Sequence, residues 1–170
     1  MKENNKRKIN ITKVLFGIYI LLLIWIILFK ASFSIADFIG LSKMRSINLI
    51  PFYYPMEVSF HLREVIANLV IFVPLGIYLK MLDNDSKKVI LYGFIFSVLL
   101  EVSQFIFKLG ATDITDVIAN VSGTILGVYG YILLEKIFKN KENINNVLRI
   151  IALIFTVLFY MLMTLLIASN

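Results

Sequence analysis

Carboxylate and amide side chains recur at helical spacing in a chain that is otherwise strongly apolar. In GATDITDVIANVSGTILG, residues 110–127, the side chains of Asp113, Asp116 and Asn120 are three and four residues apart. This spacing places them on one face of an α-helix. Two other segments carry similar polar stripes, Glu64 with Asn68 and Ser97 with Glu101 and Gln104. Carboxylates gathered in one poorly hydrated place could act as general acids and bases, or could bind a polar headgroup.

The composition is typical of a membrane protein. Of the 170 residues, 59% are hydrophobic, whereas soluble domains contain about 45–50% apolar residues. The absence of cysteine excludes disulfides, thiolate nucleophiles and Cys-based metal sites. The net charge is +6, but the basic residues lie in short clusters between apolar runs. That arrangement is typical of membrane topology and does not favour nucleic acid as a partner.

Five apolar segments are long enough to cross a bilayer, which takes about 20 helical residues. They span about 14–33, 64–81, 89–107, 116–134 and 150–167. We therefore predict an all-α, polytopic transmembrane helix bundle that forms a single domain over residues 1–170. The first segment follows a basic N-terminus like that of a signal peptide. Its bulky side chains and the lack of a small-x-small cleavage site favour an uncleaved helix.

The connection over residues 34–63 mixes aromatic, proline and charged residues, and we predict a loop with pieces at the membrane interface. Twelve of the 17 Lys and Arg residues fall on the side of the N-terminus. The positive-inside rule therefore predicts a cytoplasmic N-terminus and an extracytoplasmic C-terminus. Pro74 predicts a kink in the second helix, because it lacks an N–H and its ring presses on the carbonyl of Val70.

This topology places the polar stripes at one level, the outer ends of the second and third helices and the outer start of the fourth. Ionisable groups are costly in a bilayer, by about 2.5–3.5 kcal/mol at its centre, so they should face one another or a wet cavity. We predict a candidate polar pocket that also includes two loop residues. Its members are Glu64, Asn68, Glu101, Gln104, Asp113, Asp116, Asn120, Asn48 and Arg45.

Simpler structural roles are open for some of these residues. Asp113 is suited to cap the fourth helix, since a carboxylate satisfies free N–H groups and favours the positive helix end. Glu101 could pair with Arg63 or Arg45. The carboxylates could also hold a divalent cation, but their spacing defines no coordination shell, and we predict neither a metal nor another cofactor.

Helix packing explains further members of the stripes. Asn68 and Asn120 could form interhelical hydrogen bonds with no further role. Gly123 and Gly127 continue the stripe of Asn120 and let another helix approach closely, within the bundle or in a homo-oligomer. The residues expected at close helix contacts are Gly123, Gly127, Pro74 and Gly76.

Four motifs together resemble the VanZ family of small bacterial membrane proteins. They are LIWIILFK (23–30), RSINLIPF (45–52), REVIANLVIFVPLG (63–76) and EVSQFIFKLGATDITDVIANVSGTILG (101–127). The resemblance implies a plasma-membrane protein of Gram-positive bacteria that lowers sensitivity to teicoplanin, a lipid-tailed glycopeptide antibiotic. It implies no settled catalytic residues.

Several functions fit these features. A binding protein of the outer leaflet would engage a lipid-anchored envelope component, such as a lipid-linked cell-wall precursor, or the antibiotic itself. A membrane enzyme would use the carboxylates to modify a lipid-linked or wall-linked substrate, although no G-x-S-x-G or H-E-x-x-H motif is present. A small transporter or flippase and an accessory bundle are further alternatives. Membrane lipids are expected partners in each case.

Overall fold

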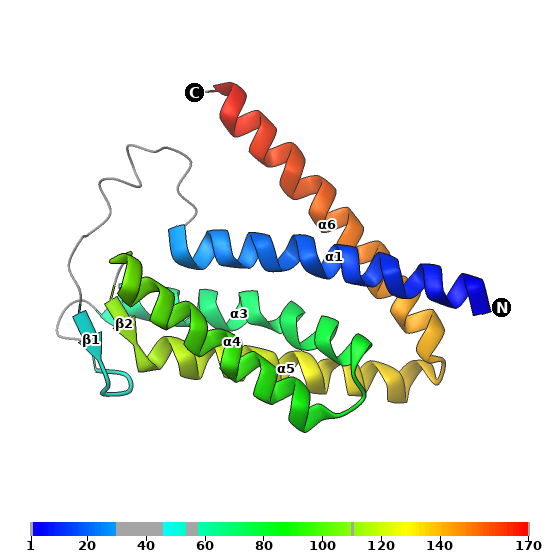
Figure 1. The fold of residues 1–170 in the computed structure, drawn as a ribbon, viewed down its shortest axis with the longest axis horizontal. Coiled ribbons are helices and arrows are strands. Elements are labelled where there is room, and N and C mark those ends of the chain that lie inside the picture. Colours follow the sequence, from blue (N-terminus) through cyan, green and yellow to red (C-terminus); the bar gives the residue numbers. More distant parts are fainter. Residues whose placement is uncertain (1, 30–45, 54–57, 110, 170) are drawn as a thin grey trace.

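The computed structural model describes residues 2–29, 46–53, 58–109 and 111–169. These residues form a bundle of long helices with two very short strands at one end (Figure 1). The elements are α1 (Lys2–Phe29), β1 (Ser46–Asn48), α3 (Val58–Leu82), α4 (Ser86–Phe107), β2 (Ala111–Asp113), α5 (Ile114–Phe138) and α6 (Lys141–Ser169). Five helices are long and apolar enough to cross a membrane. The predicted transmembrane helix bundle is therefore confirmed.

Several helices begin earlier than predicted. α1 begins at Lys2 instead of 14, α3 at Val58 instead of 64, and α6 at Lys141 instead of 150. A helix keeps its backbone hydrogen bonds beyond the hydrocarbon layer, so it can extend into water through polar residues. Hydropathy therefore marked the membrane-crossing part and missed these polar first turns. α3 is helical on both sides of Pro74, and the kink there stays a prediction.

The loop predicted over residues 34–63 is wrong in two places. Residues 58–63 are the first turns of α3. Ser46–Asn48 form β1, which pairs in parallel with β2 so that Asn48 lies opposite Asp113. The prediction for residues 30–45 and 54–57, which include Arg45, falls outside the described residues.

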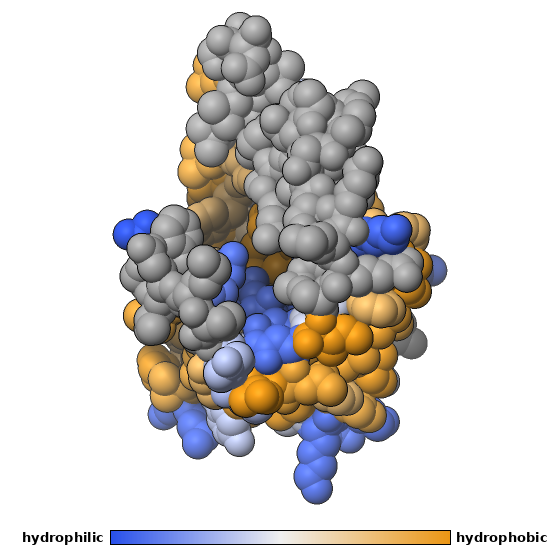
Figure 2. Space-filling model, turned by 90° about the vertical axis from the view of Figure 1, so that its left-hand side faces the viewer, coloured by the Kyte–Doolittle hydropathy of each residue, from blue (hydrophilic) through white to orange (hydrophobic). Residues whose placement is uncertain are grey.

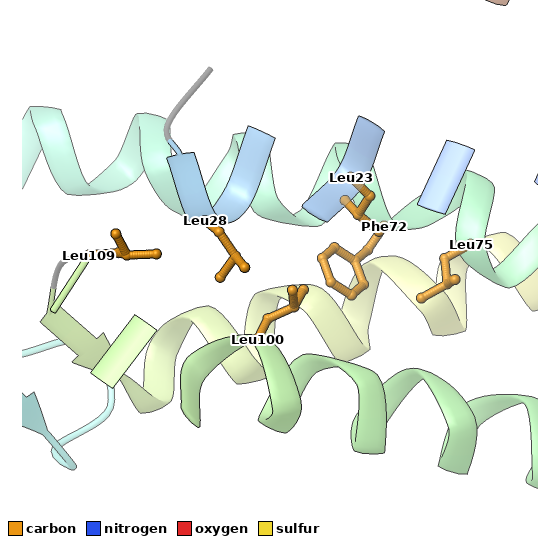
Figure 3. Close-up of a cluster of buried hydrophobic side chains, with 6 residues drawn as sticks. All are labelled: Leu23, Leu28, Phe72, Leu75, Leu100 and Leu109. Atoms are coloured by element: carbon orange, nitrogen blue, oxygen red, sulfur yellow. The ribbon is translucent and has the colours of Figure 1, made fainter. Parts of the chain in front are cut away.

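The core lies where α1, α3 and α4 meet, close to the end that carries the strands. Figure 3 shows side chains of all three helices pointing toward one another in this cluster. Its buried members are Leu23, Leu28, Phe72, Leu75, Leu100 and Leu109. On its other side, α3 packs closely along α5, so the cluster anchors the helix ends that carry the polar residues.

α6 is attached at its beginning and diverges from the bundle toward the C-terminus (Figure 1). Lys8 Nζ lies 2.5 Å from the Glu142 carboxylate. The guanidinium of Arg149 donates to the hydroxyl of Thr12 at 3.2 Å. These contacts join the first turns of α6 to α1, at the end of the bundle opposite the strands.

Candidate functional site

The polar residues named from the sequence gather where α4 ends and where α3 and α5 begin (Figure 1). We call this region the polar end. Its described members on β1, α4, β2 and α5 are Asn48, Glu101, Gln104, Asp113, Asp116 and Asn120. Figure 2 looks onto this end and shows a hydrophilic patch near its middle, with hydrophobic residues directly below it.

Glu101 connects the end of α4 to the start of α5. Its side chain is buried, with 3% of the residue exposed. Its Oε2 accepts a hydrogen bond from the backbone N–H of Asp113 at 3.0 Å, and its backbone carbonyl accepts one from the Thr112 hydroxyl at 3.2 Å. Lys108 ends α4 in the left-handed conformation, with its N–H directed to the carbonyl of Gln104. The chain therefore reverses its direction sharply after α4, and β2 lies alongside the end of that helix.

Asp113 uses both oxygens of its carboxylate. Oδ1 accepts the N–H of Thr115 at 2.8 Å, so Asp113 is the N-cap of α5. Oδ2 accepts a hydrogen bond from the side-chain amide of Asn48 at 3.0 Å. Capping, which the sequence left as an alternative to a pocket role, is therefore present together with a second interaction.

Asn48 organises the described loop residues 46–53. Its Oδ1 accepts the N–H of Ile50 at 3.2 Å, and its Nδ2 also donates to the carbonyl of Tyr53 at 3.1 Å. The N–H of Phe52 donates to Thr115 Oγ1 at 3.1 Å. Backbone pairing and side-chain bonds therefore fix the 46–53 loop to the first turn of α5.

The 46–53 loop exposes apolar side chains beside the carboxylates. The exposed fractions are 72% for Leu49, 60% for Ile50, 59% for Phe52 and 54% for Tyr53. Phe52 has φ of 58°, in the left-handed region that a bulky residue rarely adopts. Such a conformation costs on the order of 1–3 kcal/mol and persists where surrounding contacts enforce it. Here the bond from its N–H to Thr115 holds it, together with the turn closed by the Tyr53 N–H on the Ile50 carbonyl at 3.3 Å.

Buried amide side chains of the polar end join the helices to one another. Asn120 Nδ2 donates to Ser97 Oγ at 2.9 Å, and both residues are fully buried. Gln104 Nε2 donates to the carbonyl of Ile27 at 3.0 Å, which ties α4 to α1. The remaining amide oxygens, Asn120 Oδ1 and Gln104 Oε1, are buried and accept no hydrogen bond from the described part of the chain. Within the part of the chain that the structure describes, these two buried oxygens therefore lack the hydrogen bond that buried polar groups usually make.

Glycines allow α3 and α5 to touch along the backbone. A Cβ added to Gly123 would lie 2.1 Å from the carbonyl oxygen of Leu69, and one added to Gly127 would lie 2.1 Å from that of Val73. A Cβ on Gly76 would approach a backbone oxygen of α5 just as closely, at 2.1 Å. The glycine face is thus covered by α3 of the same chain, and a dimer through that face would have to displace α3.

The other predicted pocket residues lie around this network. Glu64 has a side chain that is 59% exposed, and its carboxylate lies 3.6 Å from Nδ1 of His61. Asn68 is half-buried one helical turn further along α3. Asp116 is half-buried in the first turn of α5.

Two of the simpler interpretations can be compared with the described residues. Among them, Glu101 and Arg63 form no salt bridge, and Arg45 lies outside them. Within the same residues, no three His, Cys, Asp or Glu side chains converge in a way that could hold a metal ion.

Sequence reasoning did not include Thr115 or Phe52. The hydroxyl of Thr115 accepts a bond from a residue 63 positions away, and no local pattern predicts such a partner. Pro51 is a turn signal, but a left-handed Phe52 goes against ordinary residue preference and is visible only in the structure.

Comparison with known proteins identifies a family and a relative that match most of the chain. Residues 16–139 match the VanZ/LLP1 family. Protein VanZ of Enterococcus faecium is 34% identical over 150 residues, which cover 87% of this chain and 89% of that protein. No solved structure matches the chain.

Proposed function

Since the chain belongs to the VanZ family, we propose that it is a plasma-membrane protein that lowers bacterial sensitivity to teicoplanin. In this proposal the polar end lies at the outer leaflet. It engages an amphiphile there, either a lipid-anchored envelope component, such as a lipid-linked cell-wall precursor, or the antibiotic itself. Binding at this level would keep the antibiotic from its target without any change in the wall precursor.

The observation that carries the proposal is the placement of apolar and acidic groups side by side. Leu49, Ile50 and Phe52 expose hydrocarbon surface, and the same loop is bonded through Asn48 to the carboxylate of Asp113. An amphiphile likewise has a hydrocarbon part next to a polar headgroup. Apolar and aromatic side chains are also stable at headgroup level, which suits a loop that meets lipid-anchored molecules.

The position of the buried carboxyl supports headgroup recognition. Glu101 is almost fully buried and keeps the start of α5 in place, while Asp116 is more accessible in the adjoining turn. Hydrogen bonds to a charged partner contribute about 1.5–3 kcal/mol. A headgroup with N–H or ammonium donors would therefore be held by Asp116, with Glu101 as the rigid support behind it.

The test is the teicoplanin sensitivity of cells that produce the protein variants at the wild-type level. We expect Asn48→Ala, Asp116→Asn and Glu101→Gln to lower resistance. The matched control is Asn143→Ala, which removes an exposed amide at the far end of the bundle and should leave resistance unchanged. Unchanged resistance in all three polar-end variants would overturn the proposal.

A membrane enzyme is the second candidate, favoured by the buried carboxyl of Glu101 at the start of α5, whose first turn also carries Asp116. A pair of neighbouring carboxyls can divide the roles of general acid and general base. Mass analysis of membrane lipids and wall fragments, from cells with and without the protein, separates the two candidates. A chemical difference that disappears in Glu101→Gln would favour the enzyme, and identical profiles would favour binding.

A further inference from the structure

A hollow, lined by none of the polar-end residues, lies between α1, α3 and α6. Its volume is about 370 Å³. Of its fifteen lining residues, all but Tyr19, Tyr78 and Thr156 lack a side-chain nitrogen or oxygen. No charged side chain is among the described residues that line it. The hollow is therefore a site for hydrocarbon rather than for a polar molecule.

The polar groups in the lining are largely directed into the protein. The hydroxyl of Tyr19 donates to the carbonyl of Ile71 at 2.6 Å. The hydroxyl of Thr156 donates to the carbonyl of Ala152 at 2.8 Å. The ring of Tyr78 packs against that of Tyr19, with centroids 5.5 Å apart. A guest in the hollow would thus meet mainly methyl, methylene and aromatic surface.

The divergence of α6 leaves the hollow open toward the surrounding medium. The first turns of α6 are joined to α1 by Arg149 and Glu142, and the helix then leaves the bundle (Figure 1). Ile151 and Phe155 line the hollow and are 44% and 71% exposed. They lie within the span of α6 that can cross a membrane, where the medium is the hydrocarbon of lipid.

We propose that an acyl chain of a membrane lipid occupies this hollow, wedged between α6 and the α1–α3 pair. An engineered apolar cavity of about 150 Å³ holds the six carbons of benzene. On that scale, 370 Å³ corresponds to roughly fifteen carbons, about the length of one acyl chain. A helix of a second copy is about 10–12 Å across and fits a hollow of 370 Å³ less well than a single acyl chain does. This site is separate from the polar end and does not depend on the function proposed for it.

Photo-crosslinking tests the proposal on the full chain. The protein is reconstituted in phosphatidylcholine and phosphatidylglycerol vesicles that contain a phosphatidylcholine with a diazirine in its acyl chain. After irradiation, adducts are mapped by peptide mass spectrometry. We expect several-fold more adducts at Phe155 and Phe159 than at Tyr129 and Leu133. The latter two are exposed on α5, do not line the hollow and would meet only bulk lipid in the vesicles.

Two tryptophan variants make the test specific. Ala152→Trp fills the hollow and should abolish the enrichment. Leu153→Trp adds the same ring at the next position of α6, which is 53% exposed and outside the lining, and should retain it. Equal labelling of the hollow and of α5 in the wild type would overturn the proposal. In a separate arm, a photoreactive diazirine amino acid is substituted for Phe155, and its crosslinking to a second copy of the chain would also overturn the proposal. If Ala152→Trp does not fold, the comparison between labelling at the hollow and labelling on α5 in the wild-type protein still tests the proposal.

Discussion

The side-chain amide of Asn48 donates a 3.0 Å hydrogen bond to Oδ2 of Asp113, although the two residues are 65 positions apart. The other oxygen of that carboxylate caps α5. One side chain therefore starts a membrane-crossing helix and also holds an exposed apolar loop at the same end of the bundle. Each role uses a different oxygen of the Asp113 carboxylate. A substitution of Asp113 can therefore remove one role or both.

Substitutions of Asp113 should destabilise the protein in two steps. Asparagine has one acceptor oxygen, so Asp113→Asn can keep the cap or the bond to Asn48 but not both. It should lower the free energy of unfolding by about 1 kcal/mol. Asp113→Ala loses both, and the missing cap adds about 0.5–2 kcal/mol. Unfolding of the purified protein in detergent measures the difference, and equal effects of the two substitutions would contradict the shared role.

Alanine at the glycines between α3 and α5 should destabilise the bundle. In Gly127→Ala the new Cβ would lie 2.1 Å from a backbone oxygen of Val73, so one helix must shift. Overpacking of this kind costs about 1–3 kcal/mol. Gly130→Ala, on the same helix, has no atom within 4 Å of its Cβ and should be neutral or slightly stabilising. Thermal unfolding that gave the two variants the same midpoint would refute the close α3–α5 contact.

The buried hydrogen bond between Asn120 and Ser97 should give a measurable coupling energy between substitutions of the two residues. Interhelical side-chain hydrogen bonds in membranes average about 0.6 kcal/mol and reach about 1.7 kcal/mol. A double-mutant cycle of Asn120→Ala and Ser97→Ala, followed by unfolding in detergent, should give a value in that range. Strictly additive effects would mean that the two side chains do not interact in the membrane protein.

Hydropathy and spacing predicted the helices well and the polar network only in outline. The five spans could be located because hydrocarbon imposes a length and a composition on any helix that crosses it. The first turns of α6, from Lys141, could not, because their residues are polar. Asp113 could be assigned as a cap from residue type and position. Its bond to Asn48 could not, because a three-residue parallel pair between distant segments leaves no periodic signal.

The orientation in the membrane stays a prediction, and reporter fusions test it. The bias of Lys and Arg predicts that a fusion after Asn140, between α5 and α6, reports the cytoplasm. A fusion after Asn170 should report the outside. The opposite pattern would place the polar end at the inner leaflet, and the proposal of an outer-leaflet site would have to be abandoned.

The central claim is that the exposed loop beside Asp113 meets the amphiphile, and Phe52→Gly tests it most directly. Glycine adopts φ of 58° without strain, so this variant should be as stable as the wild type and should be produced at the same level. Tyr129→Ala, which removes an exposed aromatic from α5, is the control. The measurement is the lowest teicoplanin concentration that stops growth. We predict that it falls for Phe52→Gly and stays unchanged for Tyr129→Ala; undiminished resistance in a normally produced Phe52→Gly protein would contradict the claim.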